Sequence, residues 1–358
     1  MEVDITNLRM DQAAANGSGS ASGSRDSIDS SDTYSKYGIT NIPKTTVVTP
    51  IGQTKTFAGL SAKEWVFLLF TTVNILAAIG LTVYRLVKLV DDGQSGTPDF
   101  TFIILLLLNS AFCLFYAYHG VLRERVYEMY ALMAAVLVVM VYCIVEYILN
   151  NDSRTTLKLI RLILICVLAP PNILLAWSVA KHFGYLQFRI VGASEYLQYL
   201  YNQASLFSCL LKFDVQVTAS IVVLILRNGT KVKLLEEIIL GVGIPYALGW
   251  NILGWFVLRK ELSKGAIVFA IFGLAKPTYY IYKIVEEYMD IHETIKELGD
   301  TIVYSTIAAA LLAIFVWIVL MVELYKVYKN FGKGLKERAY DVLATERTSL
   351  ITGRRIRR

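Results

Sequence analysis

Two ionisable residues stand close together inside a long apolar stretch of this sequence. Lys212 and Asp214 lie in the segment Ser208-Cys209-Leu210-Leu211-Lys212-Phe213-Asp214-Val215. A charge surrounded by hydrocarbon is costly unless it finds a partner or water. Amines and carboxylates in such surroundings pair with one another, bind ions or pass protons. The chemistry expected here is therefore that of charge held inside a membrane.

Spacing decides which partners these two charges can have. Residues two apart on a helix point about 200° away from each other, so Lys212 and Asp214 cannot neutralise one another. Lys276, in Ala275-Lys276-Pro277, lies at a similar depth in another apolar stretch. We expect Lys276 to pair with Asp214, beside a carbonyl that Pro277 leaves without its helical hydrogen bond.

A second arrangement of the same residues is open. The aromatic segment 182–201 is suited to the membrane surface. If it continues into the apolar stretch, Lys212 reaches the lipid headgroups and Asp214 caps a shorter helix. The helix left over, 215–226, is then only about 18 Å long, which is short for a bilayer.

Eight apolar stretches must position these residues, and their predicted ranges are 65–84, 101–119, 129–149, 162–180, 203–226, 238–258, 265–285 and 301–322. Most of them approach the 20 or so residues that a helix needs to cross a bilayer. The composition, 55% apolar and 18% charged, would give a soluble domain an insoluble surface. The sequence therefore predicts an all-α fold, a polytopic transmembrane helical bundle of about eight helices.

The chain divides into three predicted parts. Residues 1–60 are rich in serine, glycine and aspartate and contain no apolar core for a signal peptide, so we expect a disordered cytosolic tail. Residues 61–323 form the transmembrane helical domain. Residues 324–358 form a basic cytosolic tail.

The orientation follows from charge. Lys326 to Arg358 contains ten basic and three acidic residues, and basic residues beside membrane helices stay on the cytosolic side. An even number of crossings then puts both termini in the cytosol. The candidate glycosylation residues Asn151 and Asn228 both fall on the opposite side of that topology.

The C-terminal tail carries two sorting motifs. Tyr340 and Leu343 match a tyrosine-based adaptor motif, and Glu346, Leu350 and Ile351 match an acidic dileucine motif. They predict clathrin adaptors as partners and the plasma membrane or an endosome or lysosome as the location. Basic residues of the tail predict contact with anionic lipids.

Backbone breakers form a further group of candidates, and they are Pro170, Pro171, Gly241, Gly243, Pro245 and Pro277. Broken membrane helices at matching depth mark binding sites in transporters, because half-helix ends and free carbonyls coordinate ions or solutes. The same residues also produce simple kinks. Both interpretations are open from the sequence.

Patterns of known catalysts do not occur. The three histidines, His119, His182 and His292, have no zinc-ligand spacing, and there is no P-loop, nucleophile elbow or dinucleotide fingerprint. We therefore expect no enzyme, no metal site, no cofactor and no nucleic-acid partner. The partner to expect everywhere along the bundle is the lipid bilayer.

The stretch from Glu195 to Leu226, with Leu210-Leu211-Lys212-Phe213-Asp214, resembles a eukaryotic multi-pass membrane family catalogued only as a domain of unknown function. The resemblance covers about residues 60–330. It implies a membrane helical fold and transfers no functional residue.

Two hypotheses for function remain. In the first, Lys212, Asp214 and Lys276 line an aqueous or proton-coupled pathway of a transporter- or channel-like protein. In the second, the charges brace the helix bundle of a structural or signalling protein whose tails recruit partners. A contact between Asp214 and Lys276 away from any cavity favours the brace.

Overall fold

The computed structural model describes residues 46–49, 52–91, 93, 98–149, 156–225, 234–289 and 300–341. The predicted tail up to residue 45, and with it the disorder expected there, lies outside the described residues. So do Asn151, Asn228 and the tail from residue 342 onward.

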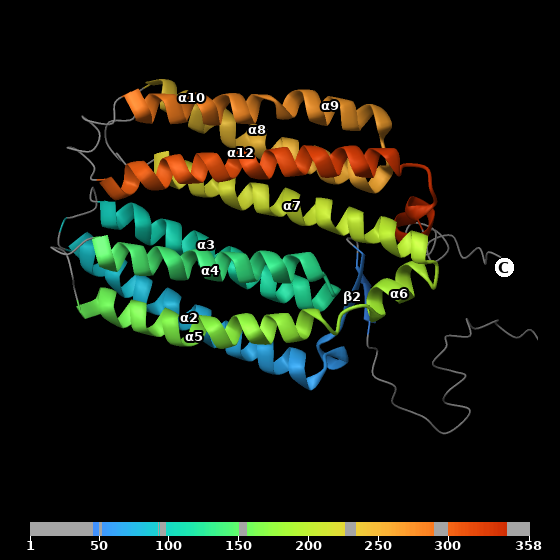
Figure 1. The fold of residues 1–358 in the computed structure, drawn as a ribbon, viewed down its shortest axis with the longest axis horizontal. Coiled ribbons are helices and arrows are strands. Elements are labelled where there is room, and N and C mark those ends of the chain that lie inside the picture. Colours follow the sequence, from blue (N-terminus) through green and yellow to red (C-terminus); the bar gives the residue numbers. More distant parts are fainter. Residues whose placement is uncertain are drawn as a thin grey trace, which may run out of the picture. The chain divides into compact units, whose positions relative to one another are not determined.

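Four long helices form a first group: α2 (Ala62–Asp91), α3 (Pro98–Arg123), α4 (Val126–Leu149) and α5 (Thr156–Ala180). Each packs against its neighbours in the chain, and α5 returns to α2. In Figure 1 they make up the blue to green part of the bundle. The turn from α3 to α4 is tight, because the Arg125 N–H donates to the Gly120 carbonyl at 2.8 Å.

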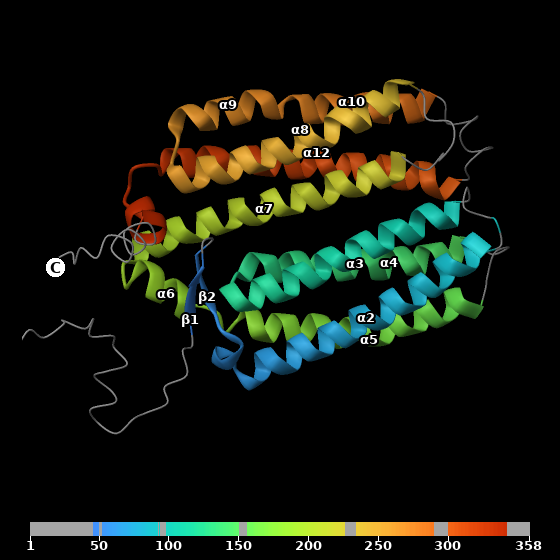
Figure 2. The same ribbon diagram turned by 180° about the vertical axis from the view of Figure 1, so that it is seen from behind.

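A second group consists of α7 (Glu195–Ile225), α8 (Leu234–Lys260), α9 (Ser263–Gly273), α10 (Ala275–Met289) and α12 (Asp300–Lys329). The short helix α6 (Tyr185–Val191) leads into it from α5. Within the group, α7 packs most extensively on α12, and it also contacts α3 and α4 of the first group. Figure 2 shows α7 between the two groups, so the seam between them runs along this helix.

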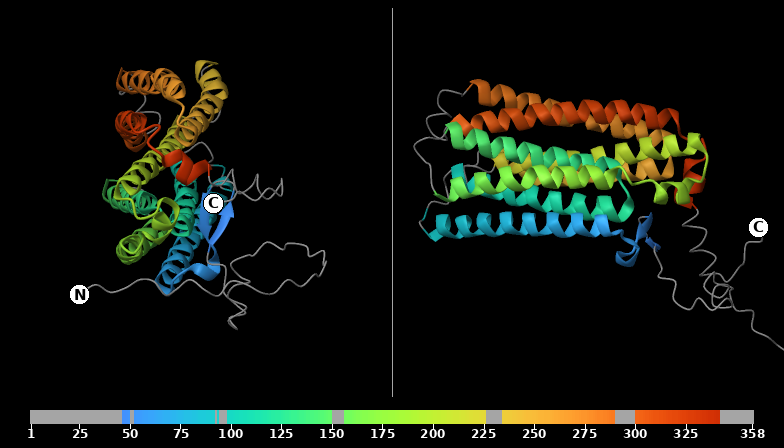
Figure 3. Two further views of the ribbon diagram at one scale, coloured as in Figure 1. Left: turned by 90° about the vertical axis from the view of Figure 1, so that its right-hand side faces the viewer. Right: turned by 60° about the horizontal axis from the view of Figure 1, so that its bottom comes forward.

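One end of the bundle, called here the hairpin end, carries several small elements. The strands β1 (Thr46–Thr49) and β2 (Gly52–Lys55) form an antiparallel hairpin, followed by the single 3-10 turn η1 (Phe57–Gly59). Helix α6 and the π-helical turn η4 (Lys336–Asp341) lie at the same end, as Figure 3 shows.

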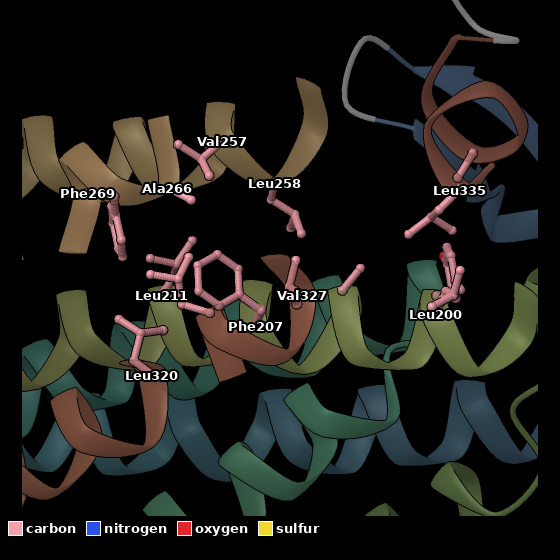
Figure 4. Packing of buried hydrophobic residues seen from close by; sticks show 14 of the residues in the cluster. Leu200, Phe207, Leu211, Val257, Leu258, Ala266, Phe269, Leu320, Val327 and Leu335 are labelled. Carbon is pink, nitrogen blue, oxygen red and sulfur yellow. The ribbon is translucent and has the colours of Figure 1, made fainter. Parts of the chain in front are cut away.

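The core of the second group is built from side chains of α7, α8, α9 and α12, among them Phe207, Leu211, Val257, Phe269 and Leu320 (Figure 4). Lipid is as apolar as these side chains, so close packing and not the hydrophobic effect must hold membrane helices together. Small residues allow that approach. A Cβ added at Gly254 of α8 would lie 2.6 Å from the Phe269 ring of α9.

Seven helical stretches of the described residues are long and apolar enough to cross a membrane, by length and composition. Helix α4 has a shorter apolar window, Val126–Val141, but its 24 residues run beside α3 and α5. At 1.5 Å per residue α4 is about 36 Å long, which also suffices for a crossing. The predicted all-α polytopic bundle is confirmed.

Three boundary predictions are corrected. Residues 46–49 and 52–55, assigned to the disordered tail, pair as strands. The predicted helix 203–226 begins eight residues earlier, at Glu195. The predicted helix 265–285 consists of two helices, α9 and α10, which meet at Leu274.

Candidate functional site

Helix α7 presents its two charges to different neighbours. It is continuous through Lys212 and Asp214, so the alternative in which Asp214 caps a shorter helix is wrong. Asp214 contacts α8 and α10 of its own group, whereas Lys212 contacts α3 and α4 across the seam. The angular separation expected for residues two apart on a helix therefore sorts the charges into two clusters.

The first cluster is an ion pair inside the second group. Lys276 Nζ donates to Asp214 Oδ2, and the two side chains are 4% and 2% exposed. Asn251 of α8 donates its amide to the same carboxylate oxygen at 3.1 Å and to the Ala247 carbonyl at 2.9 Å. Lys276 also lies 4.6 Å from the centre of the Trp250 ring. The contact that the sequence predicts between Asp214 and Lys276 is therefore present. The Asn251 amide and the Trp250 ring lie against it.

The second cluster joins the two helix groups. Glu128 of α4 accepts from Lys212 Nζ through one carboxylate oxygen and from His119 Nδ1 of α3 through the other. Lys212 Nζ also lies 3.4 Å from His119 Nδ1, and the Phe115 ring stacks on the imidazole. The Glu128 carboxylate is 2% exposed, while the side chains of His119 and Lys212 remain 20% and 26% exposed.

Further polar contacts follow the seam away from this cluster. Gln216 of α7 donates to Asn109 Oδ1 of α3 at 2.7 Å. Toward the hairpin end, the Arg125 guanidinium lies 4.9 Å from the centre of the Tyr201 ring of α7. These contacts place polar groups of both helix groups opposite one another between Tyr201 and Gln216 of α7.

A cavity of about 120 Å³ lies among the helices of the first group. Asn74 and Thr82 of α2, Asn109 of α3, and Arg161 and Asn172 of α5 are among its lining residues, and most of the others are aliphatic. A smaller hollow of about 10 Å³ near the hairpin end is lined by residues of α7, α8 and α12. Lys212, Asp214 and Lys276 line neither space.

Lysine and glutamate side chains fasten the hairpin to the helix ends. Lys55 donates to Glu64 of α2 at 2.9 Å and lies 2.6 Å from Glu124 in the α3–α4 turn. The other oxygen of Glu124 accepts the backbone N–H groups of Gly184 and Leu186 at 3.1 and 2.7 Å. Burial lowers the pKa of Lys55, but the hydrogen bonds and charges of the two carboxylates outweigh burial and hold the pKa above its ordinary value.

The predicted backbone breakers lie in different settings. Helix α5 continues through Pro170 and Pro171, and α8 continues through Gly241, Gly243 and Pro245, which fits the kink interpretation. Pro277 is in the first turn of α10, directly after the interruption at Leu274.

At that interruption, hydroxyl and indole groups of α8 satisfy carbonyls of α9. Tyr246 donates to the Phe272 carbonyl, and Trp250 donates to the Phe269 carbonyl at 2.9 Å. The interrupted helix is therefore held by protein donors.

Only one residue of the predicted sorting motifs is described. Tyr340 is half-buried in η4, and its ring lies 5.5 Å from the Arg259 guanidinium at the end of α8. Burial raises the pKa of Tyr340 to about 12. Leu343, Glu346, Leu350 and Ile351 lie outside the described residues, as do the candidate glycosylation residues.

Two members of the seam cluster did not stand out in the sequence. Glu128 lies one residue outside the predicted apolar range 129–149, and His119 is the last residue of the predicted range 101–119. Each of the two is a polar residue at the end of a predicted membrane helix, and the two helix ends face the same side of the bilayer. The sequence alone could therefore have pointed to them. Pairing them with Lys212 needed the packing of three helices.

A family model described as a domain of unknown function (DUF7789) matches residues 51–181 and 191–326, which is most of the chain. The gap between the two matched regions falls on α6, between the two helix groups. No curated protein and no solved structure matches the chain significantly.

Proposed function

We propose, for a chain that belongs to the family described as a domain of unknown function (DUF7789), a transporter- or channel-like activity in which the seam between the two helix groups opens and closes. The bundle is a membrane protein by its apolar helices. The transporter- or channel-like activity is proposed from the cluster of Lys212, Glu128 and His119 across the seam.

Partial exposure sets this cluster apart from an ordinary structural ion pair. Lys212 and His119 are a fifth to a quarter exposed, yet both belong to membrane helices. A charged amine facing hydrocarbon is strongly disfavoured, so water, a lipid headgroup or a solute must reach it. Separation of the two helix groups would break the contacts of Lys212, and their closure would restore them.

Helix α7 contacts the two helix groups through different residues. Lys212 and Gln216 contact the first group, while Asp214 is paired inside the second. In many transporters one helix bundle rocks against another around a fixed site. The pair of Asp214 and Lys276 keeps the second group together as one body while the contacts along the seam change.

Flux measurements test the proposal. Full-length protein in liposomes would be screened for currents and pH changes with inorganic cations, inorganic anions and small organic acids. Lys212→Met and Glu128→Gln should abolish any flux of the wild-type protein. The matched control is Lys326→Met, which removes another lysine that pairs with a glutamate, Glu323, at an exposed position on α12. Flux that survives both seam variants would overturn the assigned site.

A structural role is the second candidate function, and the buried pair of Asp214 and Lys276 favours it. An ion pair closed by Asn251, and outside the lining of both described cavities, serves stability and not passage. A folded wild-type protein that carries none of the screened solutes would support this candidate over the first.

We also propose the topology with both ends in the cytosol, on the charge of the C-terminal tail, and a route to the plasma membrane or the endolysosomal system through its two motifs. Accessibility tags at each terminus of the full chain test the topology. Substitution of Tyr340 and Leu350, with imaging of the protein in cells, tests the route and the adaptor partners.

A further inference from the structure

The segment that follows α12 folds back onto the bundle. Gly332 and Gly334 have φ of 75° and 91°, a left-handed conformation that glycine adopts without strain, and they turn the chain out of the line of α12. The turn η4 then packs on α6 and α8. Leu335 and Ala339 are buried in the core of the second group, and Leu335 faces Leu200 of α7 (Figure 4). The segment is therefore part of the packed bundle.

A carboxylate in the turn between α8 and α9 holds this segment in place. The two oxygens of Glu261 accept the backbone N–H groups of Gly332 and Lys336 at 2.7 and 3.0 Å. Glu261 itself has φ of 50°, which is uncommon for a residue other than glycine and is kept where surrounding contacts require it. Asn330, where the segment begins, donates to Gln203 of α7 at 2.6 Å. Groups of α7 and of the α8–α9 turn thus anchor the segment.

The tyrosine of the predicted adaptor motif belongs to the docked segment. Its ring lies 5.5 Å from the Arg259 guanidinium, which also lies 4.7 Å from the centre of the Trp255 ring. A domain that reads Tyr340 and Leu343 from an extended peptide needs the tyrosine side chain in a pocket of its own. In η4 the backbone at Tyr340 is helical and the ring packs against the bundle. The docked segment and a bound adaptor therefore exclude one another.

We infer that docking of η4 withholds the tyrosine motif from clathrin adaptors, and that the motif becomes available when residues 330–341 leave Glu261 and the bundle. The inference rests on the sorting route proposed above and adds its regulation. The apparent association constant of an adaptor is that of the undocked tail multiplied by the undocked fraction. Contacts of Glu261 and Leu335 set this fraction, so a change at either residue should raise adaptor binding while the motif itself stays intact. The inference stands whether or not the protein transports.

Binding of the clathrin-adaptor subunit that reads tyrosine motifs, to the full-length protein in nanodiscs of neutral lipid, tests the inference. Every chain carries Leu350→Ala and Ile351→Ala, so that the dileucine motif does not contribute. The reference is a free peptide of residues 336–358 with the same two changes. The peptide should bind the adaptor at least about tenfold more tightly than the full-length protein does, the value of one hydrogen bond to a charged group. Tyr340→Ala in the peptide should abolish binding.

A matched pair of glutamate substitutions isolates the docking contact. Glu261→Ala should raise adaptor binding to the full-length protein by about ten- to hundredfold, with the affinity of the peptide as the upper limit. The control is Glu195→Ala, which removes an exposed glutamate at the start of α7 and should leave binding unchanged. Leu335→Ala, which removes packing instead of charge, should act in the same direction as Glu261→Ala and takes its place if that variant does not fold.

The tyrosine motif and its docking fail separately. A peptide that does not bind the adaptor overturns the motif, and the inference with it. A peptide that binds no more tightly than the full-length protein refutes the docking inference and leaves the motif. Equal binding to the unsubstituted segment, to Glu261→Ala and to Leu335→Ala, with all three proteins folded, also refutes it.

Discussion

Removal of one partner from the buried pair of Asp214 and Lys276 should destabilise the bundle far more than removal of both. In Asp214→Asn the Lys276 ammonium keeps its place at 4% exposure without a carboxylate. Breaking a buried ion pair in this way costs about 3–5 kcal/mol, because the remaining charge has neither its counter-charge nor water. The lower figure already changes the folding equilibrium by about two orders of magnitude.

The double variant Asp214→Leu, Lys276→Met removes both charges and keeps side chains of similar volume. Replacement of a buried ion pair by apolar residues is often neutral or stabilising. Asn251 then loses one acceptor but keeps the Ala247 carbonyl at 2.9 Å. The double variant should therefore be much more stable than either single variant, and the coupling between the two positions should be large.

Reversible unfolding of the purified protein, in detergent micelles titrated with a denaturing detergent and followed by tryptophan fluorescence, measures these differences. Lys326→Met, whose exposed ammonium pairs with Glu323 on α12, serves as the control and should not differ from wild type. Single variants as stable as the double variant would show that the carboxylate and the ammonium do not depend on each other. The brace would then be refuted.

Three further outcomes are expected. Gly254→Ala should destabilise the protein by about 1–3 kcal/mol in the same unfolding titration, because the added Cβ overpacks against α9. Gly249→Ala on the same helix is the control and should be harmless, since an added Cβ meets nothing within 4 Å there. The raised pKa of Lys55 means that its contribution is complete below the ordinary value of 10.5 and is lost as pH rises through the folded value. The difference in melting temperature between wild type and Lys55→Met should therefore persist to about pH 10 and shrink only above it, and a difference that vanishes near pH 8 would contradict the contacts. Glu261→Ala should free the segment 330–341, because the carboxylate accepts the backbone N–H groups of Gly332 and Lys336, and trypsin should cut there faster than in the wild-type protein.

Apolar length and depth were sufficient to predict the helices and one contact. Lys276 could be assigned to Asp214 because both lie at mid-depth in their stretches and each demanded a partner. The same reasoning could not reach Glu128, since a carboxylate near a helix end has a second option in the headgroups. Only the packing of α4 against α7 directs it inward.

Other features are too short, or too widely spread along the chain, for sequence patterns to reveal them. Average hydropathy treats 265–285 as one stretch, but Pro277 and Gly273 allow the chain to end α9 and begin α10 within it. The hairpin of β1 and β2 is too short to give a periodic signal, and its position depends on the ion contacts of Lys55. The cavity is lined by residues of four helices, so no single stretch of sequence predicts it.

The distribution of partners along the chain has a consequence for synthesis at the ribosome. Glu128 precedes Lys212 by 84 residues, so its carboxylate is in place when the lysine emerges. Lys276 follows Asp214 by 62 residues, and at the 5–20 residues per second of translation the aspartate waits about 3–12 s for its counter-charge. During that interval α7 carries a carboxylate that lacks its counter-charge, which is costly wherever it meets lipid.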